Sequence, residues 1–460
     1  MSLNRKSQSL ASLAAALTFV LSGTVTAYGA GFEKSTSWSG HWMGVAGAAG
    51  AAVSGSESLF FNPAGLAGKQ SDVTLNISPT FSQFRAPIGQ PTGTEVYGSV
   101  QFSPPYGALA SYKVNDKLGI GVGSYISGGS RAKYDDVSTI ANGVNGPANQ
   151  ALNDFETDLT LNEVSLGAGY EIMPGLRFGA SYRISMVSAK LTKPASLAGL
   201  PGGLAALNNT VFGQARFENM KQTKWDGFRA ALQYGGTGWG VGASFRSKVS
   251  FDLSGDVTLQ TTAVAPGNPG LNIAEGTKTG TGSLSSELPE QLAVSGWFDA
   301  TPTLRTYLEY SLTHYASVKS IGTSGTFDAA NNPSTLFGGA AGSTVASGVT
   351  SSLNAGLTTA WRNQHVARIG FEYNGMSMPI RFGYALTSQV TPNQNATPTF
   401  SSPGTGNDIL VGTGYSFTSN LMANAALDYS FASGEGSSPA VVGTYGSHGY
   451  VAHLGATYVF

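Results

Sequence analysis

The 460-residue sequence contains no cysteine, so the folded chain does not depend on disulfide bonds. Charged residues are scarce at 11%, against about 25% in an ordinary soluble domain. The formal net charge is −1, so the chain has no excess of basic residues to attract nucleic acid, and we expect no nucleic-acid partner. These absences argue against an ordinary soluble protein.

A long hydrophobic run is also missing from the chain beyond its N-terminus. No stretch of about 20 apolar residues occurs there, which excludes transmembrane helices. The shorter apolar run Leu10–Leu21 follows two basic residues and precedes small residues, which predicts a secretory signal peptide over residues 1–29. Cleavage is expected after Gly29, with Ala27 and Ala30 as alternative positions. An uncleaved anchor helix is the competing interpretation.

Strict alternation of apolar and polar residues is the dominant pattern that is present. In Leu176–Met186 every second side chain is apolar and the others are small or polar, and Leu421–Phe431 and Tyr450–Phe460 repeat this pattern. Because successive side chains of a strand point to opposite faces, each segment predicts a strand with one apolar face.

The joins between these segments are short in some places and long and polar in others. This is the layout of an outer-membrane β-barrel, and lipid admits only helices or closed barrels. We predict an all-β fold, a transmembrane antiparallel β-barrel of about 14 strands, with a secreted β-sandwich or solenoid as the competing fold. The expected tight turns are 115–116, 171–175, 235–238 and 299–303, and the expected long loops are 128–154, 254–281, 320–356 and 433–447. The expected strands are 71–84, 104–114, 117–127, 155–170, 176–191, 225–235, 238–253, 283–299, 303–319, 363–374, 378–390, 407–417, 421–432 and 449–460.

Residues 30–70 lack a strand pattern and carry almost no charge, as in WSGHWMGVAGAAGAAVSGSE followed by SLFFNPAGLAG. Glycine and alanine let short helices and turns pack closely, and the Asn62 side chain can bond backbone groups in an Asn-Pro turn. A segment of this kind can fold into the lumen of a wide barrel as a plug. We therefore expect residues 30–70 to form a hatch and residues 71–460 to form the barrel, which argues against an open porin.

The stretch GFEKSTSWSGHWMGVAGAAGAAVSGSESLFFNPAGLAG resembles the N-terminal hatch of the FadL/TodX family of outer-membrane transporters of long-chain fatty acids and other hydrophobic compounds. Further stretches resemble the family in the same order, including YKVNDKLGIGVG, LPEQLAVSGW and DILVGTGYSFTSNLMANAALDYSF. The resemblance implies a barrel plugged by its hatch in the outer membrane of a Gram-negative bacterium. It implies passive uptake of hydrophobic ligands, with no catalytic residue, metal or cofactor.

The resemblance also assigns roles to residues of the hatch. Phe32 matches the aromatic residue that reaches into the family's high-affinity pocket, and the hatch motif corresponds to Asn62, Pro63 and Ala64. Ligand binding would shift the hatch and open a path.

In this family the ligand leaves sideways where the third strand kinks. The corresponding stretch here is LGIGVGSYISGG at 118–129, and glycine inside a strand marks a bulge or bend. We expect the kink at Gly119, Gly121 and Gly123. The abundance of glycine throughout the chain is the alternative explanation.

A fatty-acid carboxylate inside an apolar channel needs cationic partners. On strand 238–253 the apolar residues from Trp239 to Phe245 would face lipid, which turns Arg246 and Lys248 toward the lumen as ligand partners. The same phase argument turns four other arginines inward: Arg177, Arg183, Arg368 and Arg381. The competing interpretation is structural pairing with acidic residues across the lumen, such as Glu309 and Glu372.

The predicted loop at 192–213 contains leucines at helical spacing, among them Leu197, Leu200 and Leu204. An exposed apolar patch marks a binding site, and this one resembles the family's outer hydrophobic groove. A loop helix that packs on its neighbours is the alternative.

Long-chain fatty acids are the expected ligands, and aromatic hydrocarbons are the alternative within the same fold. An outer-membrane enzyme, an adhesin or a general porin are more distant alternatives, and the five histidines form no recognisable Ser/His/Asp arrangement. The expected partners are the hydrophobic ligand, outer-membrane lipid and, through the terminal Phe460, the outer-membrane assembly machinery. We expect a monomer.

Overall fold

The computed structural model describes residues 32, 37–68, 71–89, 93–139, 151–196, 211–262, 272–339, 342–354, 356–400, 402–438 and 441–460. The predicted signal peptide and the predicted groove residues Leu197, Leu200 and Leu204 lie outside these ranges. None of the helices in the described ranges is long and apolar enough to span a membrane.

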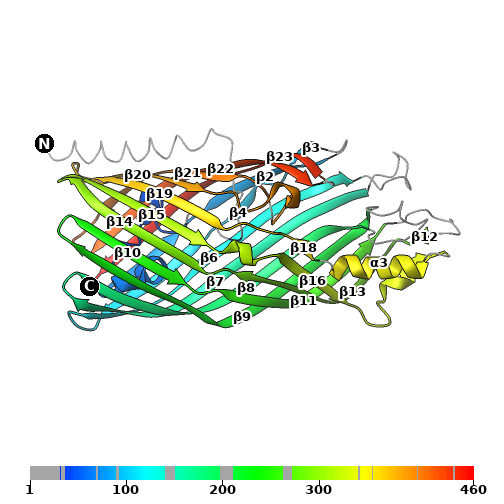
Figure 1. The fold of residues 1–460 in the computed structure, drawn as a ribbon, viewed down its shortest axis with the longest axis horizontal. Helices are drawn as coiled ribbons and strands as arrows, with labels where there is room; N and C mark the ends of the chain where they lie inside the picture. The colour runs from blue at the N-terminus through cyan, green and yellow to red at the C-terminus, as the bar shows by residue number, and fades with distance from the viewer. Residues whose placement is uncertain are drawn as a thin grey trace.

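Fourteen antiparallel strands close into a barrel, as the sequence predicts (Figure 1). The closure joins β1 (Asp72–Ile77) to β23 (Val441–Val459), with Asp72 opposite Val459. Closure pairs the first strand with the last, so their backbone polar groups bond each other across the seam.

Each barrel strand is one continuous element or two elements that follow each other along the chain. In chain order the strands are β1 with β2 (Thr80–Gly89); β4 (Gln101–Ser103) with β5 (Tyr106–Lys113); β6 (Leu118–Thr139); β7 (Ala151–Met173); β8 (Leu176–Ser196); β9 (Val211–Gly236); β10 (Trp239–Arg246) with β11 (Val249–Thr261); β13 (Gly276–Leu288) with β14 (Gln291–Thr301); β15 (Leu304–Thr313) with β16 (Ser320–Thr326); β18 (Leu357–Thr358) with β19 (Gln364–Tyr373); β20 (Ile380–Thr387); β21 (Thr405–Ser416); β22 (Leu421–Ser438); and β23. The smaller elements are β3 (Thr94–Tyr97), β12 (Asn272–Ile273), β17 (Phe337–Gly338), α2 (Ser58–Phe61), α3 (Gly342–Asn354) and the 3-10 turns η2 (Trp42–Val45), η3 (Pro63–Leu66), η5 (Tyr315–Ser317), η6 (Pro333–Leu336) and η7 (Asn393–Asn395).

Every predicted strand overlaps one of these strands, and the predicted tight turns lie where strands meet at the short-turn end. The predicted long loops are wrong in part, because the strands continue into them and the range 320–356 contains β16 and α3. The reason is that the apolar residues change from the outward face to the inward face within a single strand. On β7 the outward Leu166 is 51% exposed, whereas Leu159 and Leu161 point inward and are buried. Polar side chains therefore face outward along the far part of the strand, which in the sequence resembles a loop.

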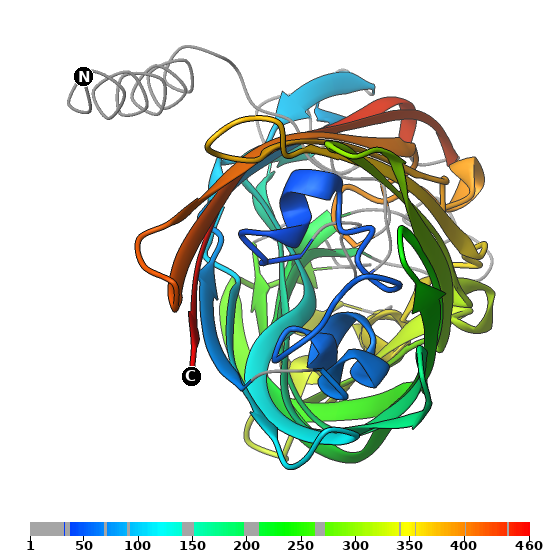
Figure 2. The same cartoon turned by 90° about the vertical axis from the view of Figure 1, so that its left-hand side faces the viewer.

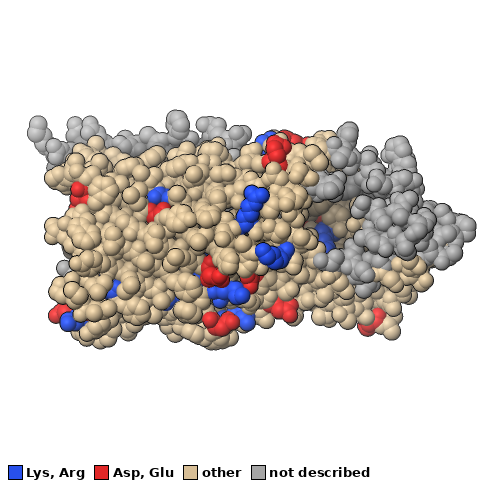
Figure 3. All heavy atoms as spheres, viewed as in Figure 1, with Lys and Arg blue, Asp and Glu red and all other residues tan. Residues whose placement is uncertain are grey.

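A row of aromatic side chains lies on the outer surface of the barrel, across the neighbouring strands β4, β2, β23 and β22. Phe102 and Phe81 have ring centroids 5.2 Å apart, Phe81 lies opposite Tyr450, and the Tyr450 and Tyr429 centroids are 5.3 Å apart. Aromatic girdles of this kind lie at the boundary between hydrocarbon and head groups. Ion pairs occupy the outward face of the neighbouring strands β6 to β8, and Figure 3 shows charged side chains gathering near the middle of one face.

Residues 37–68, which we call the luminal segment, lie inside the barrel (Figure 2). The segment contains η2, α2 and η3, and its side chains are mostly buried. It meets the wall at glycines: a Cβ at Gly179 would overlap the backbone of Pro63, and one at Gly119 would overlap the carbonyl of Leu66. Glycine is used here because it allows two backbones to approach closely.

Gly179→Ala is expected to push η3 away from the wall while the barrel still assembles, because the new methyl group would collide with backbone atoms. Increased protease cleavage within residues 37–68 of folded protein would measure the displacement. Gly296→Ala is the matched control, since a Cβ there has its nearest neighbour at 3.6 Å and should change nothing. Equal cleavage in both variants would contradict this account of docking.

Candidate ligand-binding site

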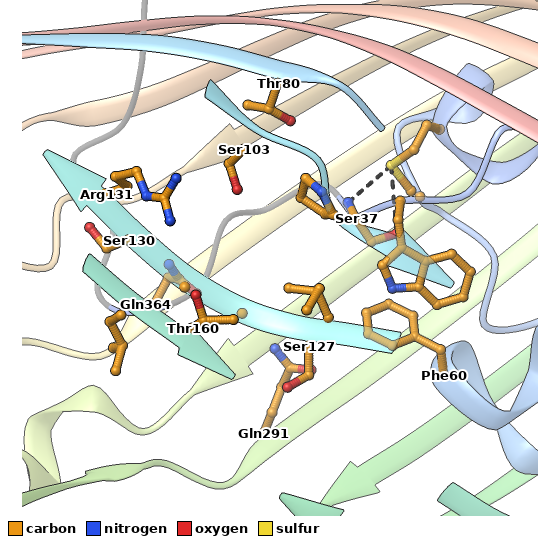
Figure 4. A pocket seen from close by; sticks show the side chains of 18 of the residues that line it. Ser37, Phe60, Thr80, Ser103, Ser127, Ser130, Arg131, Thr160, Gln291 and Gln364 are labelled. Atoms are coloured by element: carbon orange, nitrogen blue, oxygen red, sulfur yellow. Dashed lines mark hydrogen bonds between the residues drawn. The ribbon is translucent and has the colours of Figure 1, made fainter. Parts of the chain in front are cut away.

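A cavity of about 530 Å³ runs from the luminal segment to the barrel wall. Figure 4 shows Phe60 and Ser37 of the luminal segment at one end and Arg131, Ser103 and Thr80 of the wall at the other. The cavity is therefore bounded on one side by the luminal segment and on the other by strands β2, β4 and β6.

The wall is interrupted at this far end of the cavity. The pairing of β5 with β6 stops at Gly107 opposite Tyr125, and the pairing of β6 with β7 shifts register between Ile126 and Gly128. On the other side of the break, β4 pairs with β2 and is followed by two prolines, which have no N–H to offer a neighbouring strand. We call this place, residues 101–105 facing 126–131, the wall break.

The predicted kink residues Gly119, Gly121 and Gly123 lie before the break, and that prediction is wrong in position. These three keep regular pairing with both β5 and β7. Gly119 and Gly121 instead make room for the luminal segment, and the irregularity nearest to them on β6 is the bulge between Ile126 and Gly128. A bulge bends a strand because two residues oppose one across the ladder.

Three arginines surround one buried glutamate deep in the lumen. Arg183 forms a fully buried ion pair with Glu163. Arg229 and Arg246 line the cavity, are 5% exposed, and act electrostatically on the same glutamate. Arg229 donates to a backbone carbonyl of the luminal segment at 2.8 Å, and Arg246 donates to the Pro289 carbonyl at 3.1 Å. The cluster of Arg183, Arg229, Arg246 and Glu163 therefore gathers three guanidinium groups near one carboxylate beside the cavity.

The arginine predictions separate into ligand candidates and structural pairs. Arg368 lies 3.4 Å from Glu309 and Arg381 lies 2.5 Å from Glu372, which confirms the structural pairing considered for these two. Arg229 was missed by the prediction. The alternation on its strand could have found it, because its neighbour Phe228 faces outward and is 48% exposed.

The predicted inward orientation of Lys248 is wrong. Its side chain is 49% exposed and pairs with Glu287 on the outer surface, 3.2 Å between Nζ and Oε2. The cause is a break between β10 and β11: Phe245 faces outward on β10, whereas Phe251, also odd-numbered, is buried on β11. At the break, the Ser247 side chain and backbone replace regular pairing, and a change of phase moves each later side chain to the other face.

Phe32 is 1% exposed and lies in a cage of four aromatic residues. Its ring centroid is 5.0 Å from that of Trp361, and the other members are 5.8 to 6.3 Å away: Phe251, Tyr315 and Phe400. The Phe32 carbonyl accepts a hydrogen bond from the Gly129 N–H at 2.9 Å, so the cage is tied to the wall break. The sequence could not identify the cage members as a group, because they come from distant segments.

Asn62 is completely buried and holds η3 in two ways. Its Oδ1 accepts from the Ala64 N–H at 3.0 Å as the helix cap, and its Nδ2 donates to the Leu232 carbonyl at 3.1 Å. The turn formed by Asn62, Pro63 and Ala64 is therefore fixed locally and also tied to β9.

Two ionisable residues of the luminal segment have shifted pKa values. Burial raises the pKa of Glu57 to about 7, although its Oε1 accepts a hydrogen bond from Asn76 at 3.1 Å. Burial, aided by Arg381, lowers the pKa of His41 to about 4, so its ring is neutral where it stacks on Trp42 with centroids 4.4 Å apart. Within the described ranges no group of three histidine, aspartate or glutamate side chains is arranged to hold a metal ion.

Asn62→Ala is expected to weaken docking of the luminal segment by about 1–2 kcal/mol, because it removes a cap and leaves a buried carbonyl without its donor. Faster hydrogen exchange in residues 58–68 would measure this. The barrel should still assemble, and ligand uptake should fall. Asn62→Asp separates the two contacts, because it keeps the acceptor for the Ala64 N–H and loses the donor to the Leu232 carbonyl. Normal exchange and uptake in a folded Asn62→Ala barrel would contradict the assigned role.

Docking of the luminal segment is expected to weaken as pH rises from 5 to 8. An undocked Glu57 ionises near 4.5, whereas the docked residue keeps its proton up to about 7, so docking is strongest below 4.5 and weakens across that window. Protease cleavage of residues 37–68 at a series of pH values would test this. Glu57→Gln should abolish the dependence, and an unchanged pH profile in that variant would refute the assignment.

Comparison with known proteins identifies the family. The model of the outer membrane protein transport family (OMPP1/FadL/TodX) matches residues 20–438. No curated protein matches the chain. Among solved structures, a Pseudomonas aeruginosa FadL homologue has 16% identity and a TM-score of 0.69, covering 93% of this chain and 99% of that one. The P. putida toluene transporter TodX has 17% identity and a TM-score of 0.69 with the same coverage.

The Ralstonia pickettii toluene transporter TbuX is similar too, with 17% identity and a TM-score of 0.62, covering 90% of this chain and 97% of that one. At these identities the structural likeness establishes the barrel fold. The family model spans most of the sequence and agrees with that fold. The chain therefore belongs to the FadL/TodX family of transport proteins of the Gram-negative outer membrane.

Proposed function

We propose that this transport protein takes up long-chain fatty acids, passively, with lateral release through the wall break. The observation that carries the proposal is the cluster of Arg183, Arg229 and Arg246 near Glu163 beside the cavity. A ligand carboxylate in this cavity would meet guanidinium donors, and these cations would offset the cost of burying that carboxylate.

The aromatic cage supports a binding site for the apolar part of the ligand. Phe32 occupies the cage, and an alkyl chain that entered would replace the Phe32 ring with apolar surface of its own. Displacing Phe32 would also release the Gly129 N–H at the wall break. Occupation of the cage and opening of the wall would thus be coupled through one hydrogen bond.

We propose that the luminal segment is the hatch of this transporter. It lies in the lumen and is bound to the wall through Asn62, with Pro63 and Ala64 packed against it. A docked hatch would block straight passage and leave the wall break as the shorter way out. The residues Leu197, Leu200 and Leu204 remain a proposed outer capture groove.

Uptake of aromatic hydrocarbons is the second candidate. The similar structures TodX and TbuX are described as toluene transporters, and the cage around Phe32 is itself aromatic. Toluene has no charge to place beside Arg229 and Arg246. The arginine cluster therefore favours an acid, and the two candidates differ in their need for it.

We also propose that the protein acts as a monomer and is assembled through its last strand. The Phe460 side chain is 62% exposed, and its N–H bonds the Ser71 carbonyl at 3.0 Å beside the barrel seam. An exposed terminal aromatic residue at the seam is accessible to the outer-membrane assembly machinery.

Binding of oleate and of toluene to the purified protein tests the function. Oleate should bind tightly, and Arg246→Gln should weaken it about 10- to 100-fold, which corresponds to the loss of one charge-assisted contact of about 1.5–3 kcal/mol. Lys248→Gln is the matched control, because this lysine lies two residues away and faces outward. Binding of toluene but not oleate would overturn the fatty-acid proposal in favour of the hydrocarbon candidate.

A further inference from the structure

Arg131 spans the wall break with a single side chain. It follows the bulge between Ile126 and Gly128 on β6, and its Nη1 donates to the Phe102 carbonyl of β4 at 2.9 Å. Its Nη2 pairs with the Asp158 carboxylate of β7, 2.5 Å from Oδ2. The side chain therefore joins the two sides of the wall at a place beyond the end of the backbone pairing between β5 and β6.

The surroundings of Arg131 change from polar to apolar over a short distance. The cavity beside it is lined by residues with hydroxyl groups, including Ser103, Ser130 and Thr160 (Figure 4). Toward the outside lie the exposed rings of Phe81 and Phe102, which belong to the outer aromatic row. Arg131 thus lies at the border between a polar passage and the lipid-facing surface.

We propose that Arg131 is a head-group site at the exit, where the carboxylate of a departing ligand replaces Asp158 on the guanidinium. This inference rests on the proposed function. An acid that leaves sideways must keep its carboxylate solvated while its chain enters lipid, because an unpaired charge in hydrocarbon is costly. A guanidinium next to an aromatic girdle would hold that carboxylate at head-group level with the chain directed into the membrane.

The geometry allows this exchange without opening the wall further. The ion pair is partly exposed, with 37% of the Arg131 side chain and 31% of the Asp158 side chain accessible, so solvent weakens it and hydrates the displaced aspartate. The ligand would take the Nη2 side of the fork, while Nη1 keeps its bond to Phe102. Arg131 would then favour acids over neutral compounds at the exit as well as in the lumen.

Transfer of oleate and of oleyl alcohol by the protein in liposomes tests the proposal, since the two ligands share a chain and differ in head-group charge. Arg131→Gln should slow oleate transfer about tenfold, as expected for one lost ionic contact, and leave oleyl alcohol transfer and oleate affinity unchanged. Asp158→Asn breaks the same ion pair but keeps the cation, and should transfer oleate at least as fast as the unchanged protein. Lys133→Gln, on the same outward face of β6 and paired with Asp135, should have no effect.

Equal slowing of both ligands by Arg131→Gln, or equal slowing of oleate by Arg131→Gln and Asp158→Asn, would show a purely structural ion pair and overturn the head-group role. Unchanged oleate transfer by Arg131→Gln would also overturn it. Failure of the unchanged protein to bind or transfer oleate would overturn the proposed function itself, and the head-group role with it.

Discussion

Backbone N–H and C=O groups have no water to bond in the hydrocarbon of a membrane, so a chain that crosses it must pair these groups internally. This constraint requires the sheet to close, which it does between β1 and β23. It also limits how the ladder can be interrupted. At the wall break the Gly129 N–H bonds the Phe32 carbonyl, the Phe102 carbonyl bonds Arg131, and two prolines present no donor. The break persists because its polar groups have other partners.

The lumen follows a different rule, because it is filled by protein and not by lipid. Charged residues point inward and most are paired, as Arg368 is with Glu309. The luminal segment fits between them because glycines such as Gly179 remove side chains where two backbones meet. Asn62 adds hydrogen bonds that connect the segment to β9. The docking of the luminal segment on the barrel wall therefore combines close packing with a few directional contacts.

The proposed path connects three places that differ in chemistry. The aromatic cage around Phe32 suits an alkyl chain, the arginine cluster with Arg229 and Arg246 suits a carboxylate, and the wall break opens beside lipid-facing rings. A molecule with one charged end and one apolar end can use all three in turn. A neutral hydrocarbon would use only the cage and the opening, so the charge of the head group decides how much of the site is engaged.

The sequence by itself determined the strands and the non-strand segment at the N-terminus, because alternation and turn residues are local properties that lipid imposes on the outer face. It also predicted that Arg246 faces the lumen, since the alternation of side chains on β10 is uninterrupted up to that residue. Only the tertiary structure decided that Lys248 faces outward, because the phase changes between β10 and β11. The tertiary structure also sets three further features: the position of the bulge in β6, the partners of Phe32 and the bridging contact of Arg131. Each depends on which distant strands meet and where their pairing stops, and a local pattern does not contain that information.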